Sequence, residues 1–264
     1  MNNELLRRFC TPPSLPLTEY DAKVLAEATK SEVPFEGGEL AMYRWGTGKT
    51  VLLVHGWGSR ASHLALMARA LAKDGFAVAA PDMPAHSSTG CPAHSTSNMF
   101  EYCRALSAVA KAIGPLHAII GHSFGAMCAA FVTAGLHAFA GQRVTVGKLV
   151  LISTPPTLLS ILDSFCRHDG PGDSGLAELK DTLEKGFDFR VDDYMTERAL
   201  RAVSARTLLV HDSTDEEFPV RDIISMHEAA PDTELFLTQG SGHQKILASR
   251  AMIAHVKEFL QKEA

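Results

Sequence analysis

Residues 118–126 read Ala-Ile-Ile-Gly-His-Ser-Phe-Gly-Ala, and this stretch decides how the rest of the chain is interpreted. Its first three residues predict a buried strand, and the apolar positions that follow the glycines predict a helix. A serine on a sharp strand-to-helix turn exposes its hydroxyl, and flanking glycines permit the tight backbone. The motif Gly-x-Ser-x-Gly is frequent by chance, but its place between a strand and a helix predicts that Ser123 is a nucleophile.

Apolar strands alternate with amphipathic helical patterns on both sides of this motif. Glu36-Gly37-Gly38 separates two of the strands and is typical of a hairpin turn. Strands that alternate with helices form a parallel sheet covered on both faces. The sequence therefore predicts an α/β fold, with a mostly parallel central sheet flanked by helices. The expected strands are 33–35, 39–45, 51–54, 76–80, 118–120, 149–152, 208–210 and 235–237, and the expected helices are 17–30, 64–71, 100–113, 124–137 and 252–260.

The alternation lapses between residues 154 and 203, where three helices are expected around the breaker run Gly170-Pro171-Gly172-Asp173. We predict a single domain in which 1–153 and 204–264 form the core and 154–203 forms a helical lid or cap. Apolar residues of this insertion, Leu158 and Phe165 among them, are candidates for lining a substrate pocket. The alternative is that they only bury the insertion against the core. The three expected helices are 158–168, 176–187 and 192–203.

Composition is that of a globular protein. The chain has 264 residues, of which 46% are hydrophobic and 21% charged, so disordered, collagen-like and coiled-coil classes are disfavoured. The net charge of −5 carries no strong electrostatic signature of nucleic-acid or anionic-membrane binding. Five scattered cysteines (Cys10, Cys91, Cys103, Cys128 and Cys166) form no Cys-x-x-Cys pair, so neither a disulfide framework nor a zinc site is indicated.

Two stretches suggest other functions and are rejected. Residues 112–142 contain no Asp, Glu, Lys or Arg, but His117, His122 and His137 interrupt them, so a buried strand and helix are favoured over a membrane span. Residues 46–50 resemble a phosphate-binding loop, but Tyr43 stands where that motif needs glycine. The N-terminus carries no recognisable secretory signal, so a cytoplasmic location is expected.

Two further residues fit a reaction centred on Ser123. His243 lies on a glycine-rich loop between the last expected strand and the last helix, and Asp215 follows the strand before it. Asp212 is close to Asp215 and is an alternative acid. Resemblance to the spacing of the α/β-hydrolases, with Phe218-Pro219 following, favours Asp215. The order Ser, Asp, His along the chain is that of α/β-hydrolases.

The chain resembles the α/β-hydrolase fold superfamily, in its serine esterase and thioesterase branch, from about Val33 to Leu260. Four landmarks carry the resemblance: 54–58 (Val-His-Gly-Trp-Gly), 82–86 (Asp-Met-Pro-Ala-His), the turn at Ser123, and the loops of Asp215 and His243. Ala85 departs from the glycine common in the family. The resemblance implies that the backbone amides of Trp57 and Phe124 form an oxyanion hole.

By this resemblance the protein is expected to cleave a carboxylic ester or thioester through an acyl-serine intermediate, with no cofactor and no metal. Its partner is expected to be a small acyl ester or thioester; the oligomeric state stays open. His55 is expected to brace its loop, and both it and His122 are candidate pocket residues. Two alternatives remain. The first is another reaction on the same triad of Ser123, His243 and Asp215: perhydrolysis, hydrolysis of a C–C bond, a lactone or an amide, or a lyase reaction. The second is a binding protein that kept the fold and lost the activity.

Overall fold

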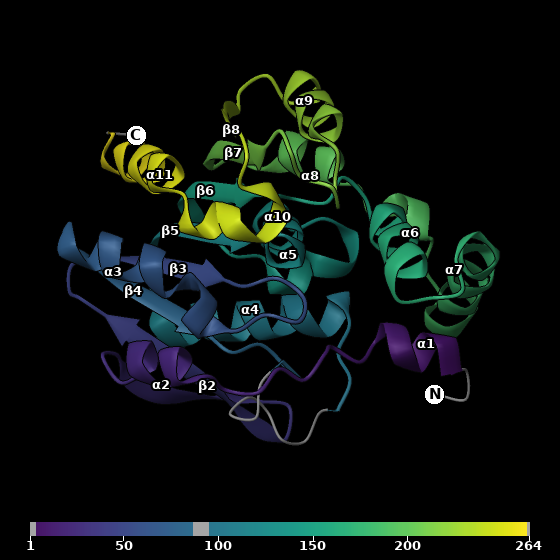
Figure 1. Ribbon diagram of the computed structural model, residues 1–264, viewed down its shortest axis with the longest axis horizontal. Coiled ribbons are helices and arrows are strands. Elements are labelled where there is room, and N and C mark those ends of the chain that lie inside the picture. The colour runs from purple at the N-terminus through teal and green to yellow at the C-terminus, as the bar shows by residue number, and fades with distance from the viewer. Residues whose placement is uncertain (1–3, 87–94, 263–264) are drawn as a thin grey trace.

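The computed structural model describes residues 4–86 and 95–262 and contains an eight-stranded sheet (Figure 1). The strand order is β1-β2-β4-β3-β5-β6-β7-β8, in which β1, β2 and β4 pair antiparallel and all other neighbours pair parallel. The expected mostly parallel sheet is confirmed. The strands are β1 Thr29–Phe35, β2 Gly38–Trp45, β3 Lys49–Val54, β4 Phe76–Pro81, β5 Leu116–His122, β6 Val146–Ile152, β7 Arg206–Asp212 and β8 Glu234–Thr238.

Helices bury both faces of this sheet, which is why its central strands are apolar at consecutive positions. In β3, Leu52 and Val54 belong to one core cluster, which also includes buried residues of α4, α5, α8 and α9. Val51 and Leu53 belong to a second cluster on the opposite face, with residues of α3 and α11. The helices are α1 Glu4–Phe9, α2 Glu19–Leu25, α3 Ala65–Lys73, α4 Met99–Ile113, α5 Phe124–Ala134, α6 Leu158–His168, α7 Asp173–Phe187, α8 Thr196–Ala202, α9 Val220–Ala229, α10 Gly242–Lys245 and α11 Arg250–Gln261.

Two expected helices end earlier than their apolar patterns suggested. The helix expected over 17–30 is only α2, because Thr29 and Lys30 pair with Arg44 and Tyr43 of β2 as the first residues of β1. The helix expected over 124–137 ends at Ala134, where Gly135 adopts the left-handed conformation (φ 65°) that terminates helices.

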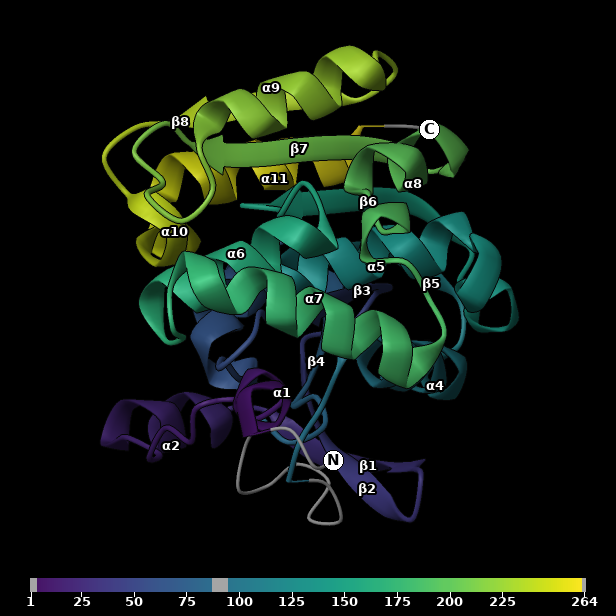
Figure 2. The same cartoon turned by 90° about the vertical axis from the view of Figure 1, so that its right-hand side faces the viewer.

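The insertion contains the three expected helices, two of them with different bounds. Helix α6 has the expected bounds, α7 begins three residues early at Asp173, and α8 covers only Thr196–Ala202. Figure 2 shows α6 and α7 in front of the sheet's central strands. Helix α1, far away in sequence, packs beside α7. The N-terminal segment and the insertion therefore meet at the same end of the sheet.

The uncharged stretch 112–142 forms β5 and the buried helix α5. Within 4–86 and 95–262, no helix is long and apolar enough to cross a membrane. The same residues contain no cluster of three or more His, Cys, Asp or Glu side chains that could hold a metal ion. Cys10, Cys103, Cys128 and Cys166 are free and buried, whereas Cys91 lies outside the described residues.

Candidate active site

Ser123 lies on a strained turn between β5 and α5. Its φ of 52° and ψ of −125° are rare for a residue with a side chain, and its N–H donates to the carbonyl of Ile152 at 2.8 Å. The two glycines of the motif permit close backbone approach: a Cβ on Gly121 would lie 2.4 Å from the Cα of Ala126, and one on Gly125 would lie 2.2 Å from the carbonyl oxygen of His55. The glycines are therefore required by the packing of the turn.

Hydrogen bonds join Ser123, His243 and Asp215 in one chain. Nε2 of His243 lies 2.9 Å from Oγ of Ser123, and Nδ1 lies 2.8 Å from Oδ2 of Asp215. Because a carboxylate only accepts hydrogen bonds, Nδ1 carries the proton and Nε2 is free to accept from the serine hydroxyl. The His243 side chain is 8% exposed and that of Asp215 is fully buried, so the aspartate end of the chain of bonds is closed to solvent.

Asp215 and Asp212 have different surroundings. Oδ1 of Asp215 accepts from the backbone amides of Glu217 (2.9 Å) and Phe218 (3.0 Å), which leaves Oδ2 for His243. Asp212 instead accepts from the backbone amides of Gly240 (3.1 Å) and Ser241 (3.0 Å), in the loop that precedes His243. Asp215 thus contacts the histidine itself, and Asp212 holds its loop.

Both carboxyl groups are held ionised. Burial would raise the pKa of Asp215, but the hydrogen bond and the charge of His243, with the amide of Phe218, outweigh it and lower the pKa. Burial would likewise raise the pKa of Asp212, but hydrogen bonds from Thr214, Thr238 and the backbone lower it strongly. A carboxylate beside His243 is therefore available throughout the neutral range.

A cavity of about 1180 Å³ opens in front of Ser123. Trp57 and Phe124, expected for the oxyanion hole, line it, and their rings meet edge to face at a centroid distance of 5.3 Å. Phe124 is the first residue of α5, where backbone amides lack partners within the helix. Leu158 and Phe165 of the insertion also line the cavity.

His55 and His122 are not on the cavity wall, which corrects their prediction as pocket residues. Both are buried behind the cavity wall, and their ring nitrogens form hydrogen bonds with backbone groups. Nδ1 of His55 donates to the carbonyl of Gly56 (2.8 Å) and its Nε2 accepts from the amide of Met83 (3.0 Å). Nε2 of His122 donates to the carbonyl of His243 (2.9 Å). Burial lowers the pKa of His55 and of His122 to about 3, so both rings are neutral braces.

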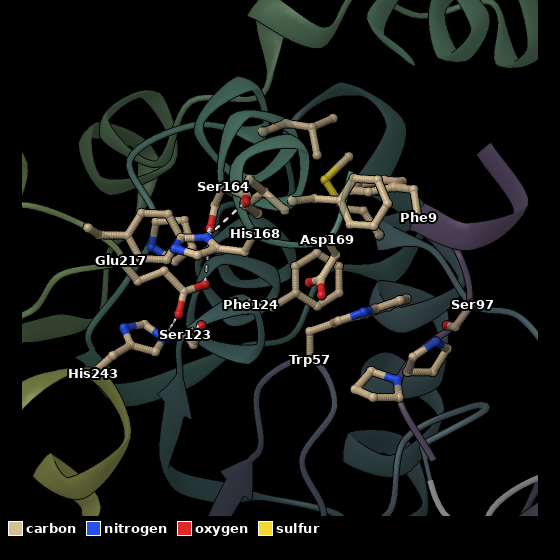
Figure 3. A pocket seen from close by; sticks show the side chains of 18 of the residues that line it. Phe9, Trp57, Ser97, Ser123, Phe124, Ser164, His168, Asp169, Glu217 and His243 are labelled. Carbon is tan, nitrogen blue, oxygen red and sulfur yellow. Dashed lines mark hydrogen bonds and ion pairs between the residues drawn. The ribbon is translucent and has the colours of Figure 1, made fainter. Parts of the chain in front are cut away.

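Sequence reasoning missed two parts of the site. The N-terminal segment lines the cavity, and the ring of Phe9 meets that of Phe165 edge to face at 5.3 Å. Glu217 also lines the cavity, with a carboxylate oxygen 3.4 Å from Nε2 of His243 (Figure 3). The acidic pair Glu216-Glu217 directly after Asp215 was the only sequence signal for this second carboxylate.

The loop after β4 carries Ala85 where the family often has glycine. Ala85 has a φ of 63°, the left-handed conformation that glycine adopts without strain. His86, next to it, is buried, and its ring meets that of Trp57 edge to face at a centroid distance of 4.7 Å. Packing thus holds alanine in a conformation where glycine is the more usual residue.

A parallel sheet with a serine on the strand-to-helix turn, hydrogen-bonded to histidine and aspartate on later loops, defines the α/β-hydrolase class. The chain belongs to the alpha/beta hydrolase family, whose model matches residues 51–255, and is by family a hydrolase. No curated protein sequence matches it significantly.

Solved structures with this fold are similar over most of the chain. An esterase of Pyrococcus furiosus has a TM-score of 0.70 at 19% identity, over 96% of each chain. A thioesterase domain from the curacin biosynthetic pathway has a TM-score of 0.64 at 16% identity, over 89% of this chain and 99% of that one. E-2-(acetamidomethylene)succinate hydrolase has a TM-score of 0.66 at 15% identity, over 89% and 100%. At these identities the similarity is one of fold.

Proposed function

We propose that the protein is a serine hydrolase that cleaves a carboxylic ester or thioester through an acyl-serine intermediate. One observation carries the proposal: the serine, histidine and aspartate form a single chain of hydrogen bonds that ends at a large cavity. Ser123 is the nucleophile, His243 the base and then the acid, and Asp215 the residue that orients the imidazole.

The mechanism follows from these positions. A serine hydroxyl is a weak nucleophile at neutral pH, so His243 takes its proton as Oγ of Ser123 attacks the acyl carbon. Asp215 stabilises the imidazolium that forms, and the imidazolium protonates the leaving alcohol or thiol. Water, activated by the same histidine, then releases the acid and restores the serine. The steps conserve protons and need no cofactor.

The amides of Trp57 and Phe124 are proposed to bind the oxyanion. Removing one such donor from a serine hydrolase raises the barrier by about 3 kcal/mol. The amide of Phe124 opens a helix, where the helix dipole adds to the attraction for negative charge. The ring contact between Trp57 and Phe124 supports the proposal that the two residues frame one oxygen-binding site.

The cavity wall favours an apolar acyl group. Rings and aliphatic side chains from the insertion, the N-terminal segment and α4 line the cavity. Burying an acyl chain against such surface stabilises binding by roughly 0.8 kcal/mol per methylene. We therefore propose an acyl group longer than acetyl. The apolar lining residues are Phe9, Met99, Phe100, Leu158, Ile161, Phe165, Leu183, Phe187 and Phe189.

The test is labelling of the purified protein by a fluorophosphonate, read by intact mass. A single adduct that is absent from Ser123→Ala and from heat-denatured protein is the expected result, followed by hydrolysis of p-nitrophenyl esters and acyl thioesters graded by chain length. A protein that neither labels nor hydrolyses small p-nitrophenyl esters would instead be a binding protein. Labelling without hydrolysis of either esters or thioesters would point to another reaction on the same residues.

A further inference from the structure

Glu217 brings a second carboxylate to the histidine that contacts the nucleophile. Its Oε2 lies 3.4 Å from Nε2 of His243, the nitrogen that also faces Oγ of Ser123 at 2.9 Å. Figure 3 shows the carboxylate of Glu217 between His243 and Ser164 of α6. Asp215 contacts Nδ1, so the two acids approach opposite nitrogens of one ring.

Two contacts fix where this carboxylate lies. The backbone amide of Glu217 donates to Oδ1 of Asp215 at 2.9 Å, so the turn that positions Asp215 also positions Glu217. At the other end, Oγ of Ser164 donates to Oε1 of Glu217 at 3.4 Å. The side chain nevertheless remains 38% exposed, and it faces the cavity in which substrate would bind. A residue that served only to hold the loop would not need a charged group at the cavity wall.

The position of Nε2 defines where the leaving group departs. In acyl transfer the protonated Nε2 donates to the leaving oxygen or sulfur, so that atom lies within hydrogen-bond distance of Nε2. Glu217 lies beside the same nitrogen. A charged substituent next to the ester bond on the leaving-group side would therefore come close to its carboxylate.

We propose that Glu217 sets the charge selectivity for the leaving group: the enzyme favours esters of cationic alcohols over neutral ones and disfavours esters of alcohols that carry a negative charge near the ester bond. This inference rests on the proposed esterase activity. In a partly hydrated site, one unit charge at about 6 Å from another changes the free energy by an amount equivalent to about tenfold in rate. Acyl groups bind against the apolar wall and are not selected by Glu217.

The experiment compares three butanoate esters that differ only in the alcohol: propanol (neutral), choline (cationic) and glycolate (anionic). We measure kcat/KM at about pH 8, where an ordinary histidine is neutral. For each protein the choline and glycolate values are divided by the propyl value, so the fraction of folded enzyme cancels. In Glu217→Gln the choline ratio is expected to fall, and the glycolate ratio to rise, each about tenfold relative to the native chain.

Glu228→Gln is the matched control, because it makes the same charge change at an exposed position of α9 outside the cavity. Both its ratios should stay within about twofold of the native values. Ser164→Ala removes the hydrogen bond but keeps the charge of Glu217, so it should preserve the order of the three esters. If Glu217→Gln does not fold, Glu217→Ala gives the same comparison.

The outcomes separate this inference from the proposed function. Unchanged ratios in Glu217→Gln, with hydrolysis still dependent on Ser123, would overturn the charge selectivity alone. Equal loss of all three activities in folded Glu217→Gln would also overturn it, because Glu217 would then act in every turnover. Native protein that hydrolyses neither esters nor thioesters would overturn the proposed function, and the inference with it. Hydrolysis of thioesters alone would overturn only the inference.

Discussion

The floor and the roof of the cavity are held in different ways. The floor consists of the loops that carry Ser123, Asp215 and His243, and both oxygens of Asp215 are hydrogen-bonded there. The roof consists of α1, α6 and α7, which meet through ring contacts such as that of Phe9 with Phe165 and through the bond from Arg8 to the carbonyl of Asp169. Phe187, on the roof, is still 41% exposed. Directional hydrogen bonds fix the proposed chemistry in the floor, and apolar packing shapes the proposed selectivity for the acyl group in the roof.

The largest effect on activity should come from Asp215→Asn, in the floor, which replaces one carboxylate oxygen with an NH₂ group. Asp215→Asn keeps the shape of the side chain but cannot accept from Nδ1–H in the same way, so His243 takes the wrong tautomer. We expect kcat to fall about 10⁴-fold, with a smaller change in stability, because removing the aspartate of such a triad has that effect in serine proteases. Steady-state hydrolysis of a p-nitrophenyl ester measures it.

Asp212→Asn is the matched control for that prediction. In the native chain both carboxylate oxygens of Asp212 accept hydrogen bonds from N–H and O–H groups. The NH₂ group of asparagine cannot accept, so at least one buried hydrogen bond is lost and the free energy of unfolding should fall by about 1–3 kcal/mol. Activity of the folded fraction should drop far less than in Asp215→Asn. The opposite ranking of the two variants would assign the orienting role to Asp212.

Three histidines buried behind the cavity should also make the protein sensitive to acid. Burial lowers the pKa of His55, His86 and His122 from 6.5 to about 3. Between these values the unfolded chain binds protons that the native protein does not, so stability is lost as pH falls below 6.5. Between pH 6.5 and 5 each ring should lower the free energy of unfolding by roughly 2 kcal/mol, and the three together by several kcal/mol. Urea unfolding at both pH values measures this.

Two variants separate the buried rings from the exposed ones. His168 lies on the roof and is exposed, so His168→Gln should leave the acid dependence unchanged. His86→Gln removes one buried ring and should reduce the dependence by about a third, whatever it does to stability at neutral pH. A free energy of unfolding that stays constant between pH 6.5 and 5 would mean that these rings are protonated in the native protein.

The floor could be predicted from the sequence because it consists of local signals at the ends of strands. Apolar strands and turn residues give the order of elements, and the motif at 121–125 marks the turn of Ser123. The family's spacing favoured Asp215 over Asp212 as the acid that faces the histidine, but the residues themselves left both open. Asp212 is the last residue of β7 and Asp215 lies three residues later, and the hydrogen bonds of the folded loop distinguish them.

The roof was harder to predict because its contacts join residues distant in sequence. Phe9 meets Phe165, and Arg8 bonds to Asp169, across more than half of the chain. A six-residue amphipathic helix such as α1 carries no signal for where it packs. The prediction of His55 and His122 as pocket residues was wrong for a related reason. Both belong to motifs of the site, but a motif does not tell whether a side chain points into the cavity or into the core behind it.

The smallest effect is expected in the roof and tests whether it recognises the acyl chain. Phe165→Ala removes a half-buried ring from the cavity wall, and Phe9→Ala removes its partner from the N-terminal segment. If both rings contact the end of a long acyl chain, each variant should lower kcat/KM for decanoyl esters about tenfold and leave acetyl esters nearly unchanged, since a lost apolar contact is equivalent to about 1–2 kcal/mol. Leu66→Ala is the control, because this apolar side chain is exposed on α3, away from the cavity. Equal losses for short and long esters in the Phe variants would show that the rings only stabilise the roof, and selectivity would then have to come from the floor.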